Sequence, residues 1–207
     1  MKQKKFLILL AIAAFAFFTT QRANASLIQN GDFGTGDFTD WSVTTASSGS
    51  NVGVGTSFGY SPYPITPPGG STYEVGFHGS GPSNDAISQN FATLPGQWYT
   101  FSFDLTGGTP PPPYGVDNNF QALWNGSTVF QINDQISTLY EPYSFTVQAT
   151  GSSTTIAFEA FNAPTYYDLA NVDVSFSAAP EPGTLFLFGS VLLGFGGFQL
   201  RKKSSAV

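Results

Sequence analysis

Alternation of apolar and polar residues is the feature that most limits how this chain can fold. From 98 to 105, Tyr, Phe, Phe and Leu occupy the odd positions, and Trp, Thr, Ser and Asp occupy the even ones. The same period of two recurs at 143–150 and 172–177. Because successive side chains of a strand point to opposite faces, each segment is predicted to be a half-buried β-strand. No segment between the two ends of the chain shows a helical period.

Six further short segments have the composition of strands. They are 38–45, 73–77, 86–91, 120–124, 129–133 and 155–161. Asn125-Gly126 separates two of them and predicts a tight hairpin, which needs positive φ at both central residues. The glycine-rich stretch 49–55 is interpreted as a flexible turn. About nine or ten strands in all predict an all-β fold, a β-sandwich of the jelly-roll type, as one domain over 26–177.

The basic residues are confined to the two ends of the chain. Between Ser26 and Pro180 there are twelve carboxylates and no Lys or Arg, and His78 is the one His. This formal charge of −12 repels phosphate backbones and excludes nucleic acid as a partner. Neutral sugars and divalent cations remain compatible partners. The absence of Cys excludes disulfides, thiolate metal sites and thiol nucleophiles. The seven basic residues are Lys2, Lys4, Lys5, Arg22, Arg201, Lys202 and Lys203.

Residues 1–25 have the three parts of a secretory signal peptide. A basic start is followed by a short apolar helix-forming run and by Ala23-Asn24-Ala25, a small-residue cleavage site. Cleavage by a signal peptidase after Ala25 leaves Ser26 as the first mature residue.

Residues 178–207 form a second targeting segment. Pro180-Glu181-Pro182 precedes an uncharged apolar run at 184–200, and Arg201, Lys202 and Lys203 follow it. The run spans roughly 25 Å as a helix, the lower limit for crossing a bilayer. It is predicted to be a transmembrane helix whose basic end stays in the cytoplasm, so that the body faces outward.

This three-part tail resembles the PEP-CTERM sorting signal of Gram-negative bacteria, which is also catalogued as the ice-binding protein C-terminal domain. The resemblance implies recognition by an exosortase during export to the cell surface or to the extracellular polymer matrix. Ice binding itself is not expected, because the threonines form no regular array.

The ends of the body carry a second resemblance. The body starts with LIQNGDF at 27–33 and GDFTDW at 36–41, and it closes with YDLANVDV at 167–174. These motifs are similar to those of galactose-binding-like jelly rolls, a group that includes many carbohydrate-binding modules. The resemblance implies a structural calcium ion, with Asp32, Asp168 and Asp173 as its ligands here. Gly34 and Ala170 replace two acidic residues that often hold this ion in the family.

No catalytic residue is predicted. His78 stands alone with Glu74 four residues before it, on the same face of a strand, and no G-x-S-x-G motif is present. The scattered acids offer no spacing that singles out a pair for glycoside hydrolysis. A glycan-acting hydrolase is therefore the weaker alternative.

Sugar-stacking aromatics are the more specific candidates for a site. Tyr60 and Tyr63 lie in one proline-rich loop, Tyr114 lies in a second, and Trp124 precedes the predicted hairpin. The amides of Asn118 and Asn119 are close in sequence. The expected function is a non-enzymatic structural or adhesive role on the outside of the cell, and the alternative is a carbohydrate-binding module for neutral polysaccharide.

Overall fold

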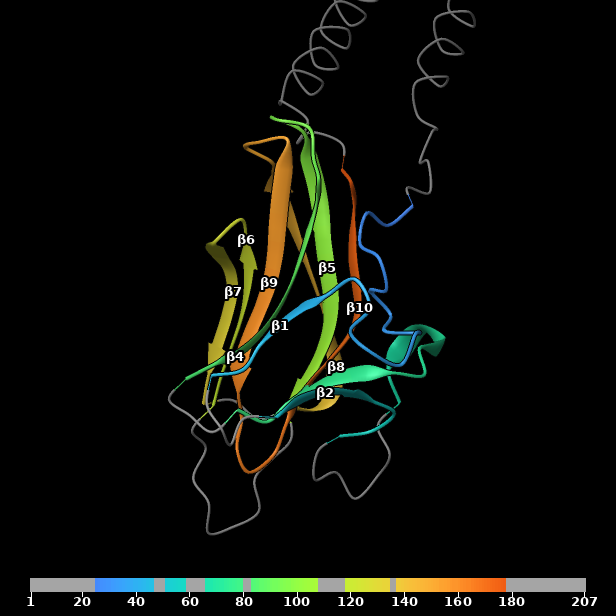
Figure 1. Cartoon of the computed structure of the whole chain (residues 1–207), viewed down its shortest axis with the longest axis vertical. Helices are drawn as coiled ribbons and strands as arrows, with labels where there is room; N and C mark the ends of the chain where they lie inside the picture. Colours follow the sequence, from blue (N-terminus) through green and yellow to red (C-terminus); the bar gives the residue numbers. More distant parts are fainter. Residues whose placement is uncertain are drawn as a thin grey trace, which may run out of the picture.

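The protein is a β-sandwich of two five-stranded sheets packed face to face (Figure 1). The computed structural model describes residues 25–46, 51–58, 66–79, 83–107, 118–134 and 137–177. Every strand pairing is antiparallel. The predicted all-β sandwich of nine or ten strands is therefore confirmed, while the predicted signal helix and transmembrane helix lie outside the described residues.

Most consecutive strands lie in opposite sheets, as in a jelly roll; β2–β3 and β6–β7 are the pairs that stay in one sheet. The first sheet contains, in spatial order, β1 (Ser42–Thr44), β4 (Asp85–Ala92), β9 (Ser153–Phe161), β6 (Asn119–Trp124) and β7 (Ser127–Asn133). The second sheet contains β2 (Val52–Gly55), β3 (Glu74–Phe77), β10 (Tyr167–Phe176), β5 (Trp98–Gly107) and β8 (Ser137–Gln148). A single 3₁₀ turn, η1 (Pro68–Gly70), precedes β3.

Each of the nine predicted strand segments overlaps one observed strand, and β2 is the strand that the sequence did not predict. The interpretation of 49–55 as a flexible turn was wrong for Val52–Gly55, which pairs with β3. β8 also starts before the predicted segment and includes Pro142. Because β8 is an edge strand, the missing N–H of a proline is tolerated there.

The predicted hairpin is confirmed. Asn125 and Gly126 connect β6 to β7 and have φ angles of 49° and 80°. Both are in the left-handed region that a tight two-residue hairpin requires. This turn fixes the register of β7, which is an edge strand of the first sheet.

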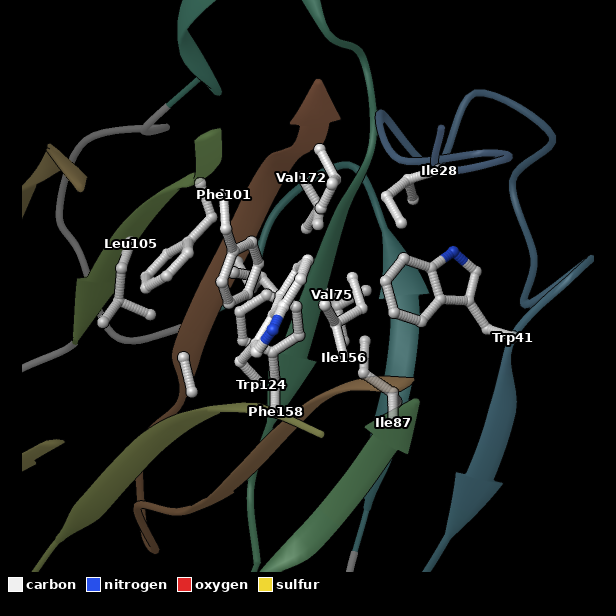
Figure 2. Packing of buried hydrophobic residues seen from close by; sticks show 14 of the residues in the cluster. Ile28, Trp41, Val75, Ile87, Phe101, Leu105, Trp124, Ile156, Phe158 and Val172 are labelled. Atoms are coloured by element: carbon white, nitrogen blue, oxygen red, sulfur yellow. The ribbon is translucent and has the colours of Figure 1, made fainter. Parts of the chain in front are cut away.

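The core between the sheets is made mainly of aromatic rings. Phe158 of β9 is fully buried and lies with its ring centroid 5.1 Å from that of Phe103, 5.7 Å from Phe101 and 6.0 Å from Phe120. Figure 2 shows Phe101, Trp124 and Phe158 gathered between the two sheets. Residues from three strands, β5 of the second sheet and β6 and β9 of the first, therefore meet around one ring.

The first described residues run beside the last strand. The backbone N–H of Leu27 donates to the carbonyl of Val174 (2.7 Å), and the N–H of Val172 donates to the carbonyl of Gly31 (2.8 Å). The start and the end of the folded body therefore lie next to each other.

Among the residues that the structure describes, no helix is long and apolar enough to cross a membrane.

Replacing Phe158 by Ala should destabilise the folded body by about 3–5 kcal/mol, because it removes a fully buried ring and leaves a cavity between the sheets. Chemical denaturation of residues 26–177 measures this change. Leu94→Ala is the control, because Leu94 is 59% exposed and its replacement should change stability by less than about 0.5 kcal/mol. Equal effects of the two substitutions would contradict this description of the core.

Candidate functional site

The outer face of the second sheet, which points away from the first sheet, carries a group of carboxyl side chains. Tyr167 and Leu169 of β10 point into the core, so Asp168 between them points outward. Asp168 is 4% exposed, and Glu74 of β3 is 1% exposed. Two acids are thus almost fully covered on the side of the sheet that faces away from the core.

Strand register brings two more polar groups to the same face. Asp104 of β5 is opposite Ala170 of β10, one pleat along from Asp168. Tyr140 of β8 donates a hydrogen bond from its hydroxyl to Oε2 of Glu74. We call Glu74, Asp104, Tyr140 and Asp168 the carboxyl cluster.

Three aromatic rings lie beside the carboxyl cluster. Phe58, which follows β2, donates its backbone N–H to Oε1 of Glu74 (2.8 Å). Its ring lies on the backbone of Gly76, where an added Cβ would come within 2.4 Å of Cγ of Phe58. The ring centroid of Tyr166 is 5.3 Å from that of Phe58 and 4.8 Å from that of His78. Phe58, Tyr166 and His78 are all half-buried, and we call them the aromatic cluster.

Glycines explain why Phe58 can lie so close to the sheet. Gly55 of β2 also faces this ring, since a Cβ there would be 2.7 Å from Cζ of Phe58. The glycines that made β2 hard to recognise in the sequence therefore leave space for the Phe58 ring to pack on the sheet. Gly36, by contrast, is required for its left-handed φ of 76°.

Asn171 connects the carboxyl cluster to the η1 turn. It lies at an irregularity of β10 with a φ of 51°. Its side-chain amide donates to Oδ2 of Asp104 and to the carbonyl of Pro68, both at 2.7 Å, and it accepts a hydrogen bond from Ser71 (2.5 Å). The chain before β3 is thereby held on the outer face.

The carboxyl cluster has unusual protonation behaviour because it is buried without a basic partner. Burial and the neighbouring Glu74 raise the pKa of Asp168 to about 8. Burial also raises the pKa of Glu74, although the hydrogen bonds from Tyr140 and Phe58 oppose this. Burial, together with the charge of Glu74, raises the pKa of Tyr140. Oδ1 of Asp168 is buried and has no hydrogen-bond partner.

The predicted calcium ligands are divided between two places. Asp32 and Asp173 line a shallow hollow of about 320 Å³ beside Asn30 and Asn171, and Asp168 is not part of its lining. Oδ1 of Asp32 already accepts the N–H of Gly34 (3.0 Å). Within the described ranges, no group of three or more His, Asp or Glu side chains is placed to hold a metal ion. Calcium binding by Asp32 and Asp173 remains a prediction.

The predicted sugar-stacking aromatics have different outcomes. Trp124 is 6% exposed in the core, and its indole N–H donates to the carbonyl of Gln148 (3.1 Å), so the prediction that it offers a stacking surface was wrong. Tyr60, Tyr63 and Tyr114 lie outside the described residues.

The predicted polar neighbours are structural. Asn118 is buried and accepts a hydrogen bond from the hydroxyl of Tyr167. Asn119 bonds to Asn84 (2.9 Å) and to Asn133 (2.6 Å).

The predicted cleavage and sorting residues are mostly outside the described part of the chain. Ser26 is described, and its hydroxyl accepts the N–H of Ile28 (3.2 Å). Ala25 is exposed at the start of the described residues. Those outside are Ala23, Pro180, Glu181, Pro182, Arg201, Lys202 and Lys203.

Sequence reasoning found only part of the carboxyl and aromatic clusters. Glu74 and His78 were expected to share a strand face, and Asp168 was singled out for calcium. Phe58, Tyr140 and Tyr166 were missed. One signal in the sequence could have placed Asp104 in the cluster, because it occupies an outward position of its alternating strand. The contacts between strands could not be predicted, because they depend on strand register.

Comparison with known proteins identifies the tail and supports the fold. Residues 178–203 match the PEP-CTERM protein-sorting motif, which confirms the predicted resemblance and indicates export with sorting at the C-terminus. A comparison of the sequence with curated proteins gives no match.

Three solved structures share the fold of the body. The enzymatically active domain of bacteriophage CBA120 tailspike protein 4 is 11% identical with a TM-score of 0.53, over 73% of this chain and 21% of that chain. The K1 cleaved adhesin domain of Lys-gingipain from Porphyromonas gingivalis is 14% identical with a TM-score of 0.50, over 71% and 96%. The CBM22-1 and GH10 modules of Clostridium thermocellum endo-1,4-beta-D-xylanase 10B, complexed with xylohexaose, are 8% identical with a TM-score of 0.50, over 77% and 30%.

The chain spans about a fifth of the tailspike structure. Carbohydrate-binding modules are also among the similar structures at lower TM-scores. At these identities the likeness establishes the β-sandwich fold.

Replacing Gly76 by Ala should displace the Phe58 ring and destabilise the body by about 1–3 kcal/mol, the usual range for overpacking. Thermal and chemical unfolding measure the loss. Gly151→Ala is the matched control, because an added Cβ there meets no atom closer than 3.6 Å. If Gly76→Ala has the same stability as the wild type, Phe58 does not pack against Gly76 in solution.

Proposed function

We propose that this protein is an exported, non-catalytic binding protein of the cell surface or extracellular matrix, and that it binds a neutral polysaccharide on the outer face of its second sheet. The observation that carries the proposal is the contact between the carboxyl cluster and the aromatic cluster on this face. The adhesive role expected from the sequence is then exerted through polysaccharide.

The chemistry of the face suits a neutral sugar. Asp104 is half-buried, and its carboxylate oxygens can accept hydrogen bonds from sugar hydroxyls. The hydroxyl of Tyr140 donates to Glu74 and can still accept a hydrogen bond from a sugar. The half-buried rings of Tyr166 and His78 offer apolar surface with polar edges for a pyranose face. The body has no Lys or Arg to hold an anionic sugar, so uncharged polymers are the favoured ligands.

The fold is compatible with this role. The structure of the CBM22-1 and GH10 modules, 30% of which matches this chain, was solved with xylohexaose, and another similar structure is an adhesin domain. Both likenesses support the fold alone, so the choice of ligand class rests on the residues of the outer face.

The burial of the acids favours binding over hydrolysis. A glycosidase needs two carboxyl groups that flank the scissile bond. Glu74 and Asp168 are 1% and 4% exposed, and Glu74 is already engaged by Tyr140 and Phe58. We therefore assign this pair to the structure of the site and not to catalysis.

The sorting motif supplies the route to the cell surface. We propose that a signal peptidase removes residues 1–25, that the 184–200 segment holds the body on the outer side of the inner membrane of a Gram-negative bacterium, and that an exosortase acts at Pro180-Glu181-Pro182. The match at 178–203 supports the sorting step at the C-terminus.

The binding proposal predicts saturable binding of residues 26–177 to at least one neutral polysaccharide on a glycan array and in calorimetry. Tyr166→Ala should weaken this binding by about tenfold or more, equivalent to about 1.4 kcal/mol, because it removes the stacking ring. Trp98→Ala is the matched control, a half-buried aromatic at the opposite end of the same sheet.

The same binding assays are run with calcium and with a chelator. The comparison shows whether calcium held by Asp32 and Asp173 contributes to sugar binding. Absence of binding in both conditions would reject the polysaccharide proposal and leave a structural role that depends on protein partners. Release of reducing ends from the polysaccharide would instead support the hydrolase alternative.

A further inference from the structure

We propose that Asp168 stays protonated next to an ionised Glu74, and that the two act as a pH-operated clasp, which holds Phe58 and the Tyr140 side chain on the outer face of the second sheet and releases them when Asp168 loses its proton. The clasp consists of Phe58, Glu74, Tyr140 and Asp168. It does not depend on the proposed sugar binding, and only its effect on polysaccharide rests on that proposed function.

Hydrogen bonding assigns the charge and the proton within the pair. Glu74 receives two donors, the hydroxyl of Tyr140 and the backbone N–H of Phe58, which is the environment of an ionised carboxylate. Oδ1 of Asp168 receives none although it is buried. An ionised Asp168 would therefore carry a buried charge on an unsatisfied oxygen, so the proton resides on Asp168 and the negative charge on Glu74.

No neighbouring described group offsets a second charge. The titratable side chains on the same face as Asp168 are Glu74 on β3, His78 directly after β3, Asp104 on β5 and Tyr140 on β8. His78 packs against the Tyr166 ring, Asp104 is itself acidic, and no Lys or Arg exists between residues 26 and 180. Loss of the Asp168 proton thus places two negative charges on neighbouring strands in a buried site.

The direction of the pH dependence follows from these contacts. Burial and Glu74 raise the pKa of Asp168 from 3.8 to about 8. A carboxyl whose pKa is raised by folding stabilises the folded state fully below its unfolded pKa and loses that contribution as the pH rises toward its folded pKa. The clasp should therefore be closed in mildly acidic medium and weaken progressively up to about pH 8.

Opening of the clasp changes the face on which polysaccharide is proposed to bind. Repulsion between the two carboxylates acts directly on the hydrogen bonds from Tyr140 and Phe58, because both end on Glu74. Movement of Phe58 also exposes its stacking partner Tyr166. Proton loss would thereby alter both the shape and the charge of the site.

The experiment measures the thermal unfolding midpoint of residues 26–177, which contain every described strand and the whole described core, from about pH 5 to about pH 9. The wild-type midpoint should fall across this range, and Asp168→Asn should abolish most of the fall, because Asn is a neutral replacement of similar shape. Glu159→Gln is the matched control, an acid on the outer face of the first sheet that accepts a hydrogen bond from Gln121. It should keep the wild-type pH dependence.

A direct titration covers the case in which Asp168→Asn does not fold. Carbon-13 NMR of Asp side-chain carboxyls in the wild type should show one that is still protonated at pH 7 and titrates near pH 8. A fall of the midpoint that is the same in Asp168→Asn and wild type, or a set of Asp carboxyls that are all ionised by pH 6, would overturn the clasp. Neither measurement uses sugar, so loss of polysaccharide binding alone would reject only the proposed function.

Discussion

The packing of phenylalanine rings between the two sheets is the interaction on which the rest of the structure depends. Phe158 contacts rings from both sheets, and burial of such rings supplies most of the energy that orders a sandwich of this size. Because side chains alternate along a strand, fixing these rings inward also fixes their neighbours outward. Asp104 and Asp168 lie on the outer face for this reason.

The outer face buries two carboxyl groups in a body that has no Lys or Arg to pair with them. Phe58 packs against Gly55 and Gly76 and covers this part of the sheet. Glu74 and Asp168 are thereby shielded from water. Buried carboxyl groups usually need a basic partner, and this body contains no Lys or Arg. Donors from Tyr140 and Phe58 compensate Glu74, and protonation compensates Asp168. The composition of the chain thus leads directly to a site that responds to protons.

The sequence predicted the parts of this protein that depend on local patterns. Period-two alternation located β5, β8 and β10, Asn125-Gly126 located a hairpin, and the tail revealed its sorting motif. It could not predict β2, because glycines carry no apolar pattern. It could not predict the pairing of Glu74 with Asp168, because only strand register joins β3 to β10. Trp124 was misassigned although it shares the parity of Phe120, which points into the core.

The most direct test of polysaccharide binding on the outer face is NMR mapping of a soluble oligosaccharide titrated into residues 26–177. The account predicts that the backbone signals that shift most belong to β3, β10, β5 and β8 near Glu74, Asp168, Asp104 and Tyr140, and to Phe58 and Tyr166. Shifts confined to the first sheet, or to the hollow beside Asp32 and Asp173, would contradict it.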